Sequence, residues 1–294
     1  MQLDAILEVT IGLVLTWLVI SIGVMQVQEW MENWLSWRSQ YLERAVRGML
    51  EDETMSAQFF THPSIKALYR KSGKNIMPPS IPPERFAKVI LDIFVNAGKP
   101  VDQMPEGQWS IEKMQHQLKE MQKTHPELAL KLGYIFKGID DTSEALEKKL
   151  AEWHKGIEDW FNDAMSMVSL EYRKNAQKWA FLIGLFIAAL LNVDTINIAT
   201  QLWREPLLRE TIVAQAEAQV AAGITDYQSV VADLQLPVGW NAKSTPVDLS
   251  GWLLKAFGLV LSGAAAAQGA PFWFDALRKL VGFKSQSSQK SKSD

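Results

Sequence analysis

The chain has 294 residues, of which 48% are hydrophobic and 21% are charged, and its formal net charge is −3. The small negative charge argues against nucleic acid as a partner. The absence of cysteine excludes disulfides, thiolate nucleophiles and cysteine-ligated metals. Three stretches almost free of charge alternate with densely charged ones. These stretches predict membrane spans, and they run from Ile6 to Val27, from Trp179 to Val193 and from Leu249 to Ala267.

The first stretch is long enough to cross a hydrocarbon core of roughly 30 Å at the rise of an α-helix. A cleaved signal peptide is the alternative reading. It is disfavoured because no Lys or Arg precedes the stretch, Asp4 and Glu8 make its flank acidic, and no small-residue cleavage site follows. Residues 1–27 are therefore expected to hold an uncleaved transmembrane helix.

A helix that crosses the membrane at the second stretch needs the polar extension DTINIATQLW, because its strictly apolar part is short. A buried core helix is the alternative. The basic flank of Arg173, Lys174 and Lys178 favours a span over 179–198.

The third stretch is interrupted by Lys255 and predicts a span over 249–270. It carries small residues spaced four apart, which let helix backbones approach closely. Whether the partner helix belongs to this chain or to a second copy stays open. The expected packing face is formed by Ser262, Gly263, Ala266, Ala267 and Gly269.

Lys and Arg are unevenly distributed around the three spans. None precedes the first span, whereas several follow it, precede the second and follow the third. Because cytoplasmic flanks carry the excess of these residues, the N-terminus is expected outside and the C-terminus inside. This topology makes 28–178 a cytoplasmic helical domain, 199–248 an external segment and 271–294 a cytoplasmic basic tail.

The expected fold is an all-α integral membrane protein whose first two spans continue into long cytoplasmic helices. Apolar residues recur at helical spacing beyond the first span, which predicts one helix from about residue 3 to 50. An amphipathic segment lying along the headgroups is the alternative for its second half. Residues 52–82 are expected to be irregular.

Helices are expected to begin near Pro83, Ser110 and Pro126. Another begins near Asp141 and runs without interruption into the second span at Trp179. Its apolar residues recur about every 3.5 positions. Packing within the core is favoured over an intermolecular coiled coil.

Three charged residues fall within the predicted spans at similar depth, in the outer third of the bilayer. They are Glu8, Asp194 and Lys255. Such residues usually face a bundle interior and pair with one another, so Lys255 is predicted to pair with Asp194 or Glu8. Asn192 and Asn197 add hydrogen-bonding capacity. Snorkelling of Lys255 toward the surface is the alternative.

The sequence holds no catalytic or metal-binding pattern. None of the four histidines, His62, His116, His125 and His154, has a metal-ligand spacing. The run from Lys71 to Lys74 lacks the full phosphate-loop pattern. We therefore expect no catalytic residue, no cofactor and no metal site, and a protein that is not an enzyme.

Two long runs, LLNVDTINIATQLWREPLLRETIVAQA and GAPFWFDALRKLV, are the most distinctive parts of the sequence. With IGLVLTWLVISIGVMQVQEW, YLERAVRGML, HPSIKALY and PSIPPERFAKVILD, they resemble a widespread bacterial inner-membrane protein family of unassigned function. The resemblance covers nearly the whole chain and implies a location in the bacterial inner membrane. It implies no activity and no site residues. The segment MQVQEWMENW departs from the family.

Two classes of function follow. The first is a non-enzymatic scaffold or anchor in the lipid bilayer that self-assembles or recruits a cytoplasmic protein partner. The second is a subunit of an oligomeric pore, because three spans cannot enclose a pore alone. In the pore, Asp194, Asn197 and Lys255 would line a polar path.

Overall fold

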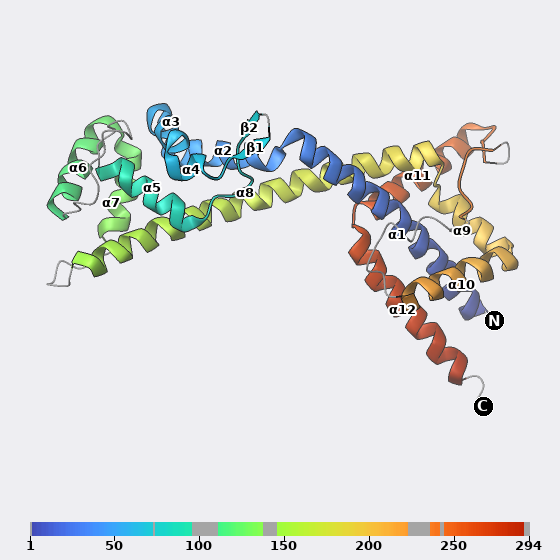
Figure 1. Ribbon diagram of the computed structural model, residues 1–294. Helices are drawn as coiled ribbons and strands as arrows, with labels where there is room; N and C mark the ends of the chain where they lie inside the picture. Colours follow the sequence, from blue (N-terminus) through green and yellow to red (C-terminus); the bar gives the residue numbers. More distant parts are fainter. Residues whose placement is uncertain are drawn as a thin grey trace. The chain divides into compact units, whose positions relative to one another are not determined.

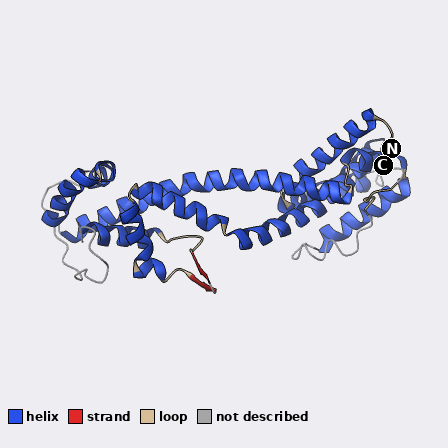
Figure 2. Cartoon of the chain, turned by 90° about the horizontal axis from the view of Figure 1, so that it is seen from above, coloured by secondary structure: helices blue, strands red, loops and turns tan. Residues whose placement is uncertain are grey.

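The computed structural model describes residues 2–72, 74–95, 111–137, 146–222, 236–241 and 244–290. The chain forms two compact units. Unit 1 consists of Met1–Asn33 and Lys174–Asp294, and unit 2 of Trp34–Arg173. Helices dominate both units (Figures 1 and 2), so the all-α prediction is confirmed apart from one short hairpin.

Unit 2 is built from short helices packed on one long one. The short helices are α2 (Trp37–Leu50), α3 (Glu53–Thr61), α4 (Pro63–Lys66), α5 (Pro83–Val95), α6 (Ile111–Thr124) and α7 (Pro126–Lys137). The long helix is α8 (Leu146–Leu191), whose first part belongs to this unit. The hairpin pairs β1 (Arg70–Ser72) antiparallel with β2 (Lys74–Ile76), and Figure 2 shows it as two red arrows.

Aromatic rings form the centre of the unit 2 core. The ring of Phe86 in α5 lies 5.3 Å from that of Phe59 and stacks at 4.3 Å on that of Phe161. Trp153, Ile157 and Phe161, four residues apart on α8, are all buried in this core. The regular apolar spacing on α8 therefore packs inside the unit, as we expected in preference to a coiled coil.

Proline marks two helix starts as predicted. Pro83 begins α5 and Pro126 begins α7, where the missing N–H of proline is not needed. The predicted irregularity of residues 52–82 is only partly right. Asp52 caps an unexpected helix, α3, by accepting a hydrogen bond from the backbone N–H of Met55 at 2.6 Å.

The single helix predicted from residue 3 to 50 is wrong. α1 (Gln2–Leu35) ends before Ser36, which has a left-handed backbone with φ 48°, and α2 begins at Trp37. No Gly or Pro signals this break. After it, α2 turns Leu42, Val46 and other residues into the core of unit 2, so burial of its apolar face outweighs the strain at Ser36.

The second long helix is confirmed where the structure describes it. α8 is unbroken from Leu146 to Leu191 (Figure 1) and includes the predicted junction at Trp179. Its expected start near Asp141 lies outside the described residues.

Unit 1 is a bundle around α1. Its other elements are the second part of α8, α9 (Thr195–Arg204), α10 (Pro206–Ala222), α11 (Leu249–Ala266) and α12 (Ala270–Lys290). Figure 1 shows α9, α10 and α12 around α1 (blue), with α11 along the end of α8. Ile11, Leu15 and Leu18 of α1 are fully buried in this bundle.

Two helices in the described part of the chain are long and apolar enough to cross a membrane. They are Asp4–Glu32 within α1, with mean hydropathy 2.3, and Leu249–Ala266, with mean hydropathy 1.4. A third span exists only if α8 and α9 are counted as one span bent by 51°. The expectation of membrane helices is therefore met, whereas the expected number of three spans is not confirmed.

Burial gives unit 2 a pH-dependent stability through His62. Its Nδ1 accepts a hydrogen bond from the backbone N–H of Ser64 at 3.2 Å, and its Nε2 lies 3.8 Å from the carboxylate of Asp92. Burial lowers the pKa of His62 below its ordinary value of 6.5, with Lys88 acting in the same direction and Asp92 opposing both. The unfolded chain thus binds this proton more readily than the folded one.

We predict that thermal stability falls as the pH drops through 6.5, the ordinary pKa of histidine. His62→Asn should flatten the change in Tm between about pH 7.5 and about pH 5.5, because asparagine still caps α4 but does not titrate. His116→Asn, on an exposed face of α6, is the control and should keep the wild-type slope. Burial raises the pKa of Asp92, so its stabilising effect has the opposite sign and is lost as pH rises. An unchanged slope in His62→Asn would contradict the assignment.

Candidate functional site

The helix that carries the second apolar stretch is broken between α8 and α9. α8 ends at Leu191, Asn192 has a left-handed backbone with φ 52°, and α9 starts at Thr195. Asparagine tolerates positive φ better than most residues. Asn192 is only 2% exposed, so the break lies inside unit 1 and its polar groups need partners within the protein.

A distant segment of the chain supplies partners for the end of α8. The backbone N–H of Gly239 donates to the carbonyl of Leu191 at 2.8 Å, and the indole Nε1 of Trp240 donates to the carbonyl of Ala189 at 3.0 Å. In return, Nδ2 of Asn192 donates to the carbonyl of Gly239 at 2.7 Å. These bonds satisfy carbonyls that the end of a helix leaves unpaired.

Asp194 satisfies the start of α9. Its Oδ1 accepts hydrogen bonds from the backbone N–H groups of Ile196 at 3.0 Å and Asn197 at 3.2 Å. The carboxylate also lies against α11, where a Cβ atom on Gly258 would be only 1.8 Å from Oδ1. Asp194 and Asn197 thus come together as predicted, but as a helix cap in which Asn197 takes part through its backbone.

Lys255 is buried beside this break and forms no ion pair with any residue that the structure describes. It is 3% exposed, its Nζ donates to the carbonyl of Ser244 at 2.8 Å, and the same atom lies 4.6 Å from the ring centre of Trp240. The predicted pair with Asp194 or Glu8 does not form among the described residues. A carbonyl dipole and an aromatic face stabilise the ammonium group instead, while Asp194 is engaged in capping.

Glu8 belongs to a separate ionic network. Its carboxylate accepts from Nε of Arg209 at 2.9 Å and lies 3.5 Å from Nζ of Lys284. Lys284 is also 3.2 Å from Glu217. The network joins α1, α10 and α12, and no pattern in the sequence indicated it.

This network conflicts with the predicted topology. Lys284 was expected in the cytoplasmic tail, 271–294, and Glu217 in the external segment, 199–248. Two groups 3.2 Å apart cannot lie on opposite sides of a hydrocarbon core about 30 Å thick. In this structure the tail is instead the helix α12, which packs against α10.

The predicted small-residue face packs within the chain. Oγ of Ser262 lies 2.8 Å from Oγ1 of Thr195. A Cβ atom on Gly263 would be 3.0 Å from the Cα of Leu185, and one on Gly184 would be 3.0 Å from the Cβ of Ala266. The absence of larger side chains therefore allows α11 to approach α8 closely.

The remaining two residues of that face lie at the turn after α11. Ala267 follows the last residue of the helix and is partly buried in the unit 1 core. Gly269 has φ 87°, a left-handed conformation that favours glycine. The turn brings Nε1 of Trp273 to 2.6 Å from the carbonyl of Ala265, so α12 folds back from α11.

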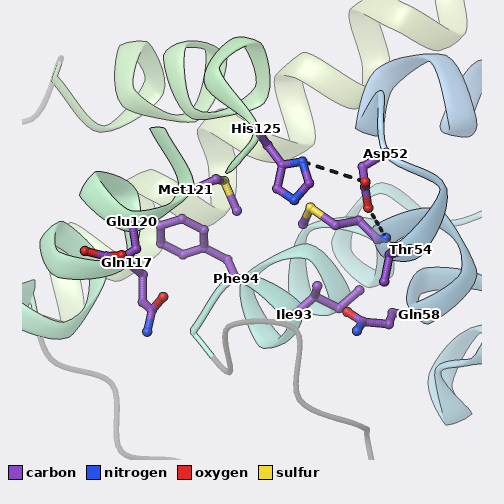
Figure 3. Close-up of a pocket in the computed structure, with 10 residues that line it drawn as sticks. Asp52, Thr54, Gln58, Ile93, Phe94, Gln117, Glu120, Met121 and His125 are labelled. Atoms are coloured by element: carbon purple, nitrogen blue, oxygen red, sulfur yellow. Dashed lines mark hydrogen bonds and ion pairs between the residues drawn. The ribbon is translucent and has the colours of Figure 1, made fainter. Parts of the chain in front are cut away.

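Unit 2 contains a cavity of about 390 Å³ between α3, α5 and α6. The Nδ1 of His125 lies 3.7 Å from Oδ2 of Asp52. Figure 3 shows the His125 ring directed toward Asp52, with Glu120 and Gln117 across the cavity. Asp52 is already the cap of α3. No hydroxyl in the described part of the chain is hydrogen-bonded to His125, so His125 is not paired with a nucleophilic hydroxyl there.

Comparison of the chain with protein-family models, curated proteins and solved structures finds no match. The family resemblance and the expected absence of enzymatic activity therefore stay predictions.

Sequence reasoning found Asn192 and Asp194 but missed the residues that complete the site. Trp240 and Ser244 come from the loop before α11, and Gly258 comes from α11 itself. The position of Gly258, one turn after Lys255 on α11, was the available signal. A glycine on the same helix face as a buried charge indicates close approach of another group.

We predict that Gly258→Ala displaces the Asp194 cap and destabilises unit 1 by about 1–3 kcal/mol, the usual effect of overpacking. This loss of stability is measured by thermal unfolding of the full chain in detergent, with Trp fluorescence as the signal. Gly282→Ala is the matched control, because a Cβ atom on that helical glycine meets nothing within 4 Å. Equal stability of the two variants would show that Asp194 does not contact α11.

Proposed function

We propose that the protein is a non-enzymatic integral membrane scaffold that anchors unit 2 at the membrane surface. The chain connectivity of unit 2 carries this proposal. Its first residue, Trp34, lies in α1 and its last, Arg173, lies in α8, and both helices continue into apolar stretches. A double connection keeps unit 2 at the bilayer, where it is available to a protein partner or to further copies of the chain.

The exposed surface of unit 1 supports a lipid environment. Leu182, Phe186 and Leu190, four residues apart on α8, are 52%, 67% and 63% exposed. Leu249, Leu253 and Phe257 repeat the pattern on α11. Rows of large apolar side chains facing outward are unfavourable in water but suit hydrocarbon or a second copy. Self-assembly would use these faces, because the small-residue face of α11 already packs on α8.

The oligomeric pore is the second candidate, and one observation favours it. Oδ1 of Asn192 is buried and has no hydrogen-bond partner among the described residues, as expected for a group that binds water or an ion. The rest of the cluster argues against a conducting path. Asp194 and Lys255 are 5% and 3% exposed and are occupied by neighbouring backbone groups.

For the sidedness, we infer that unit 2 faces the cytoplasm of a bacterial inner membrane. The basic residues before Trp179 and after the first span still favour this orientation. The contacts of Lys284 with Glu8 and Glu217 support an external C-terminal end of α12. This inference replaces the cytoplasmic tail expected from sequence.

Single-cysteine labelling tests the sidedness, because the natural chain contains no cysteine. Exposed positions are available in unit 2 (Ala57→Cys), α10 (Ala214→Cys) and α12 (Ser285→Cys). In intact cells, an impermeant maleimide should label the α10 and α12 variants, and the unit 2 variant should react only after lysis. If the α12 variant and the unit 2 variant were labelled under the same condition, both in intact cells or both only after lysis, the external position of α12 would be contradicted.

Ion flux in liposomes separates scaffold from pore. We expect the reconstituted full chain to give no more flux than protein-free liposomes, because the charged groups at the break are buried. The Asp194→Asn variant, which retains an acceptor for the cap, is tested beside it. A robust conductance that disappears in Asp194→Asn would overturn the scaffold in favour of the pore.

A further inference from the structure

A second cavity of unit 2 has a composition unlike the first. It has a volume of about 450 Å³ and lies between α2, the proline-rich segment that leads into α5, and α8. Its wall includes apolar side chains such as Leu42, Ile81 and Phe161. The apolar wall would accept the hydrocarbon part of a ligand.

The polar groups of this cavity are cationic. Arg38 and Arg173 both line it, and no Asp or Glu of the described residues does. Neither arginine forms an ion pair with a described residue, and both are exposed. The cavity shown in Figure 3, in contrast, is lined by Asp52 and Glu120. Those carboxylates are engaged by the backbone of Met55 and by Lys123, so it is the cationic lining that distinguishes the second cavity.

Two tyrosines add an aromatic side to the cavity. The rings of Tyr41 on α2 and Tyr172 on α8 meet edge to face, with their centres 5.8 Å apart. Tyrosine combines an apolar ring with a polar hydroxyl and is favoured where hydrocarbon meets polar groups. The cavity thus presents apolar, aromatic and cationic groups together.

Both arginines are close in the chain to the apolar helices. Arg38 follows the last residue of α1, Leu35, by three positions. Arg173 precedes Trp179 by six positions on the continuous helix α8, a rise of about 9 Å. A rise of this size ends at about the outer edge of the headgroup layer, which is roughly 5–8 Å deep on each side of the hydrocarbon core.

We propose that this cavity binds the phosphate group and adjoining apolar part of an anionic phospholipid. The two guanidinium groups bind the phosphate, which they match in geometry and charge. The apolar wall holds the glycerol and upper acyl region. The inference rests on the proposed membrane location, and it adds a lipid partner that the membrane anchoring itself does not require.

Lipid preference of the purified full chain tests the site. Native mass spectrometry in detergent compares retained phosphatidylglycerol with retained phosphatidylcholine. We expect wild type to prefer phosphatidylglycerol, and Arg38→Gln/Arg173→Gln to lose that preference by roughly tenfold, the scale of a charge-assisted contact. The control is Lys174→Gln/Lys178→Gln, which removes equal charge from neighbouring exposed positions outside the cavity. Equal losses in both variants would overturn a specific site.

Protection of a single cysteine locates the lipid. Ser169 lines the cavity and Ser166, three residues earlier on α8, does not, although both are exposed. Phosphatidylglycerol should slow maleimide modification of Ser169→Cys and leave that of Ser166→Cys unchanged. Protection of both or of neither would contradict the proposal.

A third arm distinguishes a lipid from a free phosphate. Inorganic phosphate added without lipid should not protect Ser169→Cys. Protection by inorganic phosphate alone would replace the lipid with a soluble ligand. Resistance of the protein to carbonate extraction tests membrane anchoring separately. An anchored protein without lipid preference would overturn this inference and leave the proposed function intact.

Discussion

The arrangement of unit 1 depends on satisfying the backbone at the break between α8 and α9. A helix that ends inside an apolar bundle exposes carbonyls, and one that begins there exposes N–H groups, each costing several kcal/mol if unpaired. Gly239 and Trp240 bond the carbonyls at the end of α8. Asp194 accepts from the N–H groups at the start of α9. The break is therefore possible only with the loop before α11 in place, which couples two segments far apart in sequence.

The same constraint explains why small residues surround the break. Asp194 lies where α11 has Gly258, and any side chain there would occupy the position of the carboxylate. Farther along α11, Gly263 brings the helix backbone against α8, and Ser262 is hydrogen-bonded to Thr195 at the start of α9. Trp17 of α1 donates to the same Thr195 hydroxyl at 3.1 Å. Three helices are thus joined by polar contacts at one level of the bundle, where hydrophobic burial alone would not fix their register.

Local patterns predicted much of the fold, and contacts between distant residues account for what they missed. The starts of α5 and α7 at prolines and the continuity of α8 follow from short-range rules. The break at Ser36 has no such signal, because burial of α2 in its unit decides it. For Lys255 and Glu8, counting residues gives a depth but not a direction around the helix axis. Lys255 donates to the carbonyl of Ser244, and Glu8 pairs with Arg209. The depth of each residue in its span could not predict either partner.

Ionisable residues within a membrane segment are usually taken as functional, yet in this chain their contacts have structural explanations. Asp194 caps a helix, Lys255 fixes the loop that covers the break, and Glu8 joins three helices through Arg209 and Lys284. Each of these three charged side chains bonds neighbouring backbone or side-chain groups. Burying a charge in this way costs less free energy than leaving those polar groups unpaired. Specific recognition is then better sought in unit 2, where one cavity is lined by Arg38 and Arg173, neither of which forms an ion pair among the described residues. In the proposed scaffold, unit 2 is joined to apolar helices at both of its ends and would meet lipids at a high effective concentration, so even a modest cavity there could select among them.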